Sequence, residues 1–200
     1  MKAIYRKLMR EFAFRTGRGV TLWQAACHPN GDEWAEWLKQ HGGLHKMGKH
    51  CSIQTNVVIT DPAYLSIGNN VRLSGCKLFG HDGTVNMLNR AYGLNLDKVG
   101  PIVIGDNVFI GDGAKVMPGV TIGSNVVIAA GAIVAGNVES HCVYAGIPAK
   151  RIGKIDDMVT RMARNSSSYP WAPLIQKRGS SFDPALEPEL VEMRVAHFFQ

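Results

Sequence analysis

The sequence predicts a mainly β fold, a parallel β-helix in which short strands stack into a prism, with helical segments before and after it. Three observations predict this fold. An aliphatic residue recurs at every sixth position through the middle of the chain, a small residue usually follows it, and one long polar segment interrupts the pattern. A period of six fits neither the 3.6-residue repeat of a helix nor the alternation of a half-exposed strand. We therefore expect each hexapeptide to form one short strand and one corner, and three hexapeptides to close one coil.

The strongest part of the repeat lies in the second half of the chain. Its aliphatic positions keep their register without a slip: Ile104, Ile110, Val116, Ile122, Ile128 and Val134. Four residues after each comes a small or β-branched residue: Val108, Ala114, Val120, Val126, Ala132 and Val138. Stacked coils pair in parallel and bury a ladder that no single repeat could bury alone. A β-sandwich, the alternative, spaces its strands more widely, at about 8 to 12 residues.

A weaker tract of the same repeat comes earlier, with two extra residues in its middle. Its aliphatic and aromatic positions are Met47, Ile53, Ile59, Ile67, Leu73 and Phe79, and its companions are Cys51, Val57, Ala63 and Val71. Between the two tracts, residues 80–103 form a long loop that opens with Gly80, His81, Asp82 and Gly83. Such an excursion from a regular solenoid is usually functional or disordered.

Helical segments flank the repeat. Two helices are expected before it, over 3–15 and over 32–40, the second with Asp32 as N-cap and Gly42 and Gly43 as its stop. After the repeat we expect a helix over 155–164, a loop from Ser166 to Pro184, and a terminal helix over 187–199. The chain therefore divides into an N-terminal helical segment (1–46), a β-helix domain (47–153) with its loop at 80–103, and a C-terminal extension (154–200).

Composition excludes several classes of protein. Lys and Arg number 22 against 16 Asp and Glu, which gives a net charge of +6, and 46% of the residues are hydrophobic, enough to bury a core. No apolar run approaches the length of about 20 residues that spans a membrane. The basic residues are scattered and do not form a stripe, so nucleic-acid binding is not expected. Charged residues interrupt the first fourteen positions, which argues against a secretory signal and for a cytoplasmic protein.

The four cysteines form no C-x-x-C pair, and we expect them to be buried thiols: Cys27, Cys51, Cys76 and Cys142. No metal site is expected either. The related prism of the γ-class carbonic anhydrases holds zinc with three histidines. Residues 104–139 of this chain contain no histidine.

The hexapeptide rule, the loop with Gly80 and His81, and the closing segment from Tyr144 to Lys150 (YAGIPAK) resemble the hexapeptide-repeat acyltransferases. The resemblance covers residues 47–153. Within that superfamily the chain is similar to the O-acetyltransferases of sugars and bacterial surface polysaccharides, and also to the xenobiotic acetyltransferases. The resemblance implies a left-handed β-helix, which is an exception to the right-handed crossover rule. It also implies a homotrimer in which acetyl-CoA and the acceptor meet between neighbouring prisms.

Acetyl transfer from a thioester to a hydroxyl requires a base with a pKa near neutrality, which suits histidine. Of the seven histidines, only His81 stands where the coils open into the loop, and it matches the catalytic histidine of the family. The alternative for His81 is a solvated loop residue. Asp82, its neighbour in sequence, could orient the imidazole or simply face water.

The resemblance also implies candidates for binding acetyl-CoA. The backbone amides of Asp112 and Ala130 match those that hold the pantetheine arm, and Phe109 offers a packing surface or covers a neighbouring subunit. Lys150 and Arg151 follow the last coil, where cations suit the phosphates of CoA. A solvated charge pair is the alternative for these two residues.

Polar residues of the earlier coils are candidates for the acceptor. Gln54, Asn56 and Asp61 lie about where family members meet their acceptor, and polar side chains suit sugar hydroxyls. Asn56 and Asp61 could instead be corner residues.

The function we expect is acetyl transfer from acetyl-CoA to a sugar hydroxyl in surface polysaccharide biosynthesis, of a capsule, an O-antigen or an exopolysaccharide. The alternatives are an amino-sugar N-acetyltransferase, an antibiotic O-acetyltransferase, and, less favoured, a non-catalytic scaffold. The basic residues of the first helix could also touch a membrane that carries a lipid-linked acceptor, although a solvated helix face is the simpler reading. These residues are Arg6, Lys7, Arg10 and Arg15.

Overall fold

The computed structural model describes residues 2–179 and 182–199, which form two compact units, Met1–Ile155 and Asp156–Gln200. The first unit begins with three helices and continues as a parallel β-helix, from which a loop with a further helix projects, and the second unit is helical. Among the described residues, no helix is long and apolar enough to cross a membrane.

The first unit begins with helices α1 (Lys2–Thr16), α2 (Val20–Cys27) and α3 (Gly31–His41). The helices expected over 3–15 and 32–40 are confirmed, with Gly42 as the C-cap of the second. Its N-cap is Asn30 and not Asp32, because the Asn30 side chain accepts hydrogen bonds from the amides of Asp32 and Glu33. The eight-residue helix α2 was not expected. It is short and carries no side-chain cap, so it lacks the usual start signal.

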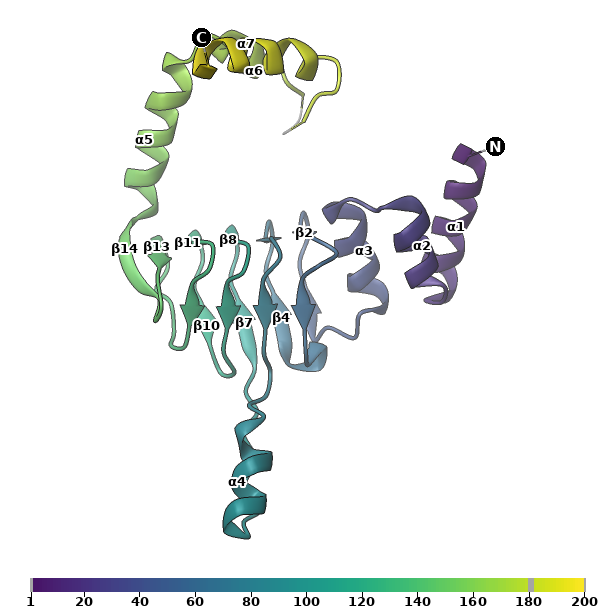
Figure 1. Cartoon of the computed structure of the whole chain (residues 1–200), viewed down its shortest axis with the longest axis vertical. Helices are drawn as coiled ribbons and strands as arrows, with labels where there is room; N and C mark the ends of the chain where they lie inside the picture. Colours follow the sequence, from purple (N-terminus) through teal and green to yellow (C-terminus); the bar gives the residue numbers. More distant parts are fainter. Residues whose placement is uncertain (1, 180–181, 200) are drawn as a thin grey trace. The chain divides into compact units, whose positions relative to one another are not determined.

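Three parallel sheets form the sides of a prism, which we name sheets A, B and C (Figure 1). Sheet A contains β1 (Lys46–Met47), β4 (Leu65–Ile67), β7 (Ile102–Ile104) and β10 (Thr121–Ile122). Sheet B contains β2 (Ser52–Ile53), β5 (Arg72–Leu73), β8 (Val108–Ile110), β11 (Val126–Ile128), β13 (Cys142–Ala145) and β14 (Lys150–Lys154). Sheet C contains β3 (Val58–Ile59), β6 (Lys77–Leu78), β9 (Lys115–Val116) and β12 (Ile133–Val134). Among the strands of the described residues, β14 alone runs antiparallel, against β13.

The strand register reproduces the repeat. Ile104 pairs with Ile122, Ile110 with Ile128, and Val116 with Val134, so each full coil takes eighteen residues. Every aliphatic and companion position expected between 104 and 138 is buried. The coil expected from three hexapeptides is therefore confirmed.

The weaker tract was only partly right. Leu78 takes the ladder position expected for Phe79, since it pairs with Val116 and is buried whereas Phe79 is only partly covered. Ala63 is exposed, because the chain accommodates the two extra residues in a short 3-10 helix (Pro62–Tyr64), and Leu65 is buried in its place. Of the four free cysteines, three are buried as expected, and Cys27 is partly covered.

The loop between the two tracts contains an exposed helix, α4 (Thr84–Tyr92), which projects away from the prism (Figure 1). Its base is closed by backbone pairing. His81 and Val99 form an antiparallel bridge, and the Gly100 amide donates to the Gly80 carbonyl at 2.9 Å. The two ends of the loop are thereby held together where it leaves the prism.

The second unit follows with α5 (Ile155–Ser168), α6 (Ala172–Gln176) and α7 (Glu187–Phe199). The expected first and last helices are present, but α5 continues to Ser168 and α6 lies where a loop was expected over 166–184. Positions 180 and 181 of that expected loop lie outside the described residues. The unit buries Trp171 and Leu190.

Candidate functional site

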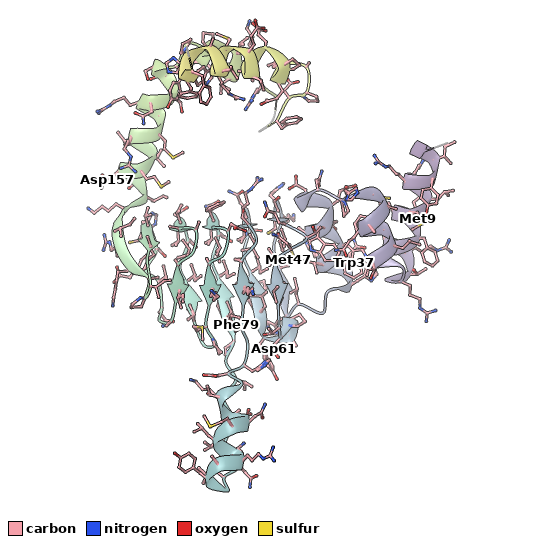
Figure 2. All side chains as sticks on the ribbon, viewed as in Figure 1. Met9, Trp37, Met47, Asp61, Phe79 and Asp157 are labelled. Atoms are coloured by element: carbon pink, nitrogen blue, oxygen red, sulfur yellow. The ribbon has the colours of Figure 1, made fainter. Side chains whose placement is uncertain are left out.

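His81 and Asp61 meet at the edge of the prism between sheets C and A. Asp61 follows β3 in the first coil, and His81 follows β6 in the second. His81 Nδ1 lies 2.7 Å from Asp61 Oδ2. Figure 2 places Asp61 at the border of the prism from which the α4 loop departs. The His81 side chain is 51% exposed, and among the described residues none bonds to its Nε2.

Three donors converge on the Asp61 carboxylate. The Thr60 hydroxyl donates to Oδ2 at 2.5 Å and the Gly80 amide at 3.1 Å, besides the imidazole of His81. The Thr60 hydrogen bond is the main reason that the pKa of Asp61 is lowered, and the hydrogen bond and charge of His81 lower it further. An ionised Asp61 accepts from Nδ1–H, which leaves the lone pair of the neutral imidazole on Nε2.

Gly80 makes this close approach possible. A Cβ at Gly80 would lie 2.5 Å from the Cβ of Asp61 and 2.9 Å from its Oδ2. Any other residue at position 80 would therefore displace the carboxylate from His81. Gly83, two residues after His81, has no atom within 4 Å of the corresponding position.

One interpretation of the sequence was that Asp82 orients the imidazole of His81. The structure does not support it. Asp82 Oδ2 forms an ion pair with Lys98 Nζ at 2.6 Å, and Asp82 Oδ1 accepts from the Thr84 amide at 3.0 Å. These contacts, with that of Lys98 first, lower the pKa of Asp82. Side chains adjacent along an extended chain point apart, so Asp82 ties the two ends of the loop together while His81 faces Asp61.

A second edge of the prism, between sheets B and C, gathers the other polar candidates. Gln54 and Asn56 lie between β2 and β3, Asp112 between β8 and β9, and Ala130 between β11 and β12. All four residues are exposed. They lie along this one edge in the first, third and fourth coils, and sheet C separates them from His81.

The backbone amides of Asp112 and Ala130 donate no hydrogen bond to any described residue, whereas their neighbours along the chain are engaged. The Gly111 amide donates to the Ile128 carbonyl, and the Gly131 amide to the Asp112 carbonyl at 2.8 Å. Two exposed donors at one corner, one coil apart, can bind a chain of amides such as the pantetheine arm. The two amides suggested by the sequence are thus free to do so.

Phe109 lies on the outer face of sheet B, in the strand that leads to Asp112. It is 37% exposed and lines a shallow depression of about 240 Å³ with Asn70, Arg72 and Val127. The depression extends toward Asn70 and Asn107, which precede β5 and β8, so it lies on the side of the strand away from Asp112.

Lys150 and Arg151 line a cavity of about 450 Å³ at the C-terminal end of the prism. Ala135, Gly136 and Asn137 line the same cavity from the last coil. Arg151 also contacts Glu139, with 3.3 Å between Nη1 and Oε2, while no described acidic group pairs with Lys150. Two cations beside a hollow are compatible with a phosphate ligand.

Within one chain, the candidate residues therefore lie at three separate places. His81 and Asp61 lie at one edge, the amides of Asp112 and Ala130 at another, and Lys150 and Arg151 at the end of the prism. Asp61, expected to meet the acceptor, instead contacts His81. Sequence reasoning missed Thr60 and Lys98, which hold the two aspartates, and it noted Gly80 only as part of the loop and not for the space that it leaves to Asp61. The repeat gave no clear signal for the Asp61 contact, because paired strands of the first two coils are twenty residues apart in sheet B (Ile53 and Leu73) but nineteen apart in sheet C (Ile59 and Leu78).

Comparisons with known proteins bear on this arrangement. Residues 101–136 match the family model described as bacterial transferase hexapeptide (six repeats). Over 125 residues the chain is 39% identical to Protein CapG of Staphylococcus aureus. The matched region covers 60% of this chain and 72% of that protein. Over 122 residues it is 34% identical to the galactoside O-acetyltransferase of Escherichia coli strain K12, and the match spans 58% of this chain and 57% of that enzyme.

Among solved structures, the chain is similar to a hexapeptide-repeat-containing acetyltransferase of Vibrio cholerae, with a TM-score of 0.53 and 23% sequence identity. The superposition covers 76% of this chain and 93% of that one. At this identity the likeness establishes the fold, a stack of hexapeptide coils with appended segments.

Proposed function

This chain belongs to the hexapeptide-repeat acyltransferase family, and we propose that it transfers an acetyl group from acetyl-CoA to a sugar hydroxyl. The observation that carries the proposal is the contact between His81 Nδ1 and Asp61 Oδ2 at 2.7 Å, with Nε2 left open to solvent. This is the arrangement that a general base for an alcohol requires.

The proposed reaction proceeds by direct attack. Ionised Asp61 accepts the Nδ1 hydrogen bond and keeps the imidazole in the tautomer whose Nε2 can accept a proton. As the acceptor hydroxyl attacks the thioester carbonyl, its proton passes to Nε2, and the positive charge of the imidazolium is balanced by Asp61. The tetrahedral intermediate then collapses. The carbon–sulfur bond breaks, and the proton on Nε2 returns to the departing thiolate of CoA.

We propose a homotrimer as the functional form. Sheet C separates the edge that carries His81 from the edge that carries the free amides of Asp112 and Ala130. In a cyclic trimer of prisms, one edge of each copy can lie against the other edge of the next copy. Each site would then take its base from one copy and its pantetheine donors from the neighbour.

Binding roles follow from this placement. The amides of Asp112 and Ala130 would donate to pantetheine carbonyls and Phe109 would pack beside the arm. Lys150 and Arg151 would meet the phosphates at the end of the prism. We propose left-handed coils, as in the family, and assign the chemistry to residues 47–153, with 1–46 and 154–200 as appended segments. A cytoplasmic location belongs to the same proposal, because acetyl-CoA is available there.

A sugar acceptor is supported by the similarity to an enzyme named a galactoside O-acetyltransferase and by the exposed Gln54 and Asn56 on the amide edge. Amide side chains can both donate to and accept from sugar hydroxyls. Segments outside the coils favour a larger acceptor, such as a nucleotide-linked, lipid-linked or polymeric glycan of a surface polysaccharide.

An acetyl transfer assay tests the proposal. Purified protein is incubated with acetyl-CoA and a panel of nucleotide sugars, oligosaccharides and hydroxylated antibiotics, and the products are then treated with alkali. An alkali-labile acetyl ester on a sugar is the expected product. An alkali-stable amide, or transfer to an antibiotic alone, would refute the choice of a sugar hydroxyl, and no transfer to any acceptor would refute the enzyme as proposed.

A further inference from the structure

Helix α1 carries an apolar stripe that the first unit leaves uncovered. Ile4, Leu8 and Phe12 follow one another at intervals of four residues and lie on one face of the helix. Their exposed fractions are 67%, 59% and 51%. Tyr5, beside them, is 51% exposed. A stripe of this size is rare on a surface that meets only water.

The stripe is not the face that holds α1 on the protein. Ala13 is buried in a cluster with Trp23 and Trp37, against which Met9 also packs, and the Trp37 indole donates to the Ala13 carbonyl at 3.1 Å. Figure 2 shows Met9 and Trp37 among these packed helices. The helix is therefore packed on the protein through one face, and the exposed residues Ile4, Leu8 and Phe12 are not part of that packed face.

Positive charge is concentrated around the same helix. Residues 1–20 contain six basic side chains and one acidic, Glu11, which gives +5 of the net +6 of the chain. The first turn of α1 has no acidic residue. Arg10 pairs with Glu33 at 3.1 Å, but Arg6, Lys7 and Arg15 form no ion pair with any described residue. Uncompensated cations next to an apolar stripe point to an anionic partner with an apolar interior.

We propose that α1 is an interfacial helix that docks on an anionic lipid bilayer. Ile4, Leu8 and Phe12 would enter the boundary between headgroups and acyl chains. Lys7 and Arg15, which lie beside the stripe, would meet the lipid phosphates, whereas Arg6 lies on the packed face with Met9 and Ala13. A second copy of the chain is a poorer occupant of the stripe, since two facing copies would bring two segments of charge +5 together.

Docking bears on the acceptor, and this step rests on the proposed function. Cyclic symmetry would place the three α1 helices of a trimer at the same height along its axis, so all three could meet one membrane plane. Three helices that each bind the membrane weakly would then bind together. The trimer would therefore have a higher apparent affinity for the bilayer than one helix has alone. A trimer held in this way would work where a glycan on a lipid carrier is presented.

Vesicle sedimentation tests the docking of α1. The full chain is mixed with vesicles of phosphatidylcholine alone, or of phosphatidylcholine with phosphatidylglycerol, at low and at high salt. We expect binding to the mixed vesicles, little binding to the neutral ones, and release by salt. Leu8→Glu should weaken binding by at least about ten-fold. Lys7→Ala and Arg15→Ala should each weaken it by about five-fold.

Met162→Glu is the matched control, because Met162 is 55% exposed on α5 of the second unit. It should bind the vesicles as the unmodified chain does, and circular dichroism should show unchanged helix content in every variant. Three outcomes would overturn the proposal: no binding of the unmodified chain to phosphatidylglycerol vesicles, an equal loss in Met162→Glu, or a self-association that Leu8→Glu abolishes. Lipid binding is read without acetyl transfer, so failure of the enzymatic proposal would appear separately.

Discussion

The imidazole of His81 and the carboxylate of Asp61 lie one coil apart and in direct contact, with 2.7 Å between Nδ1 and Oδ2. Because stacked coils place equivalent corners above one another, two residues twenty positions apart in the chain become neighbours. Their contact depends on a third position, since Gly80 leaves the space that the Asp61 side chain occupies.

Asp61→Asn should lower kcat for acetyl transfer by at least about ten-fold, and His81→Ala by at least about a hundred-fold. The amide can no longer balance the imidazolium charge, while the alanine removes the base altogether. Steady-state kinetics provide the measurement, and the KM for acetyl-CoA should stay nearly constant in both variants. A His81→Ala enzyme with unchanged turnover would remove His81 from the reaction.

Gly80→Ala should reduce turnover to a similar extent as Asp61→Asn, because the new methyl group would meet the Asp61 side chain. Gly83→Ala is the control, since no atom lies within 4 Å of the Cβ it would add. Kinetics and thermal unfolding of both variants give the comparison. Equal effects of the two substitutions would show that loop flexibility, and not the placement of Asp61, limits the reaction.

Ala130→Pro should raise the KM for acetyl-CoA by about three- to ten-fold, the worth of one hydrogen bond. Proline removes the amide donor, and the turn accepts it. Gly131 has φ of +71° and the Ala132 amide donates to the Ala129 carbonyl at 3.3 Å, as in a type II turn, which favours proline before the glycine. Ala130→Gly keeps the amide and should leave the KM unchanged. If both variants shift the KM alike, the corner and not the amide is responsible.

Asp82 should stabilise the protein only while it is ionised. Its pKa in the fold is lowered, so the ion pair with Lys98 contributes stability above the ordinary aspartate pKa of about 3.9, and the contribution is lost as the pH falls below that value. Asp82→Asn should therefore lower the melting temperature at pH 6, by a few degrees at most for so exposed a pair. The difference from the unmodified protein should shrink at pH 3. A difference that stays constant with pH would mean that hydrogen bonds to Thr84, and not charge, hold the loop.

Much of this fold could be read from the sequence, because the hexapeptide period encodes it directly. Every inward position between Ile104 and Val138 was identified, since each coil repeats the same spacing. The first coils were harder. The short helix at Pro62–Tyr64 absorbs the extra residues and shifts the ladder from Phe79 to Leu78. Helix α2 could not be predicted in the same way, because it has no side-chain cap to mark where it begins.

The candidate site was predicted in parts. His81 stood out because it opens the loop, but its partner did not, since contacts between coils depend on the exact register of the irregular first turn. Asp82 is the carboxylate next to His81 in the sequence, but it pairs with Lys98, and the carboxylate that contacts the imidazole is that of Asp61. The free amides of Asp112 and Ala130 came from the resemblance to the family, because backbone donors carry no side-chain signature.

Mixing two impaired variants tests most directly whether each site is built from two copies of the chain. One variant carries His81→Ala, and the other carries Asp112→Pro with Ala130→Pro. The two are refolded together at equal concentration and assayed with acetyl-CoA well below the KM of the proline variant, where the loss of both amides makes that variant slow. If the base and the amides come from neighbouring copies, each mixed trimer contains one intact site, and about a quarter of the activity of the unmodified enzyme should return. If a single copy supplies both, no intact site can form, and the mixture would stay at the mean activity of the two variants.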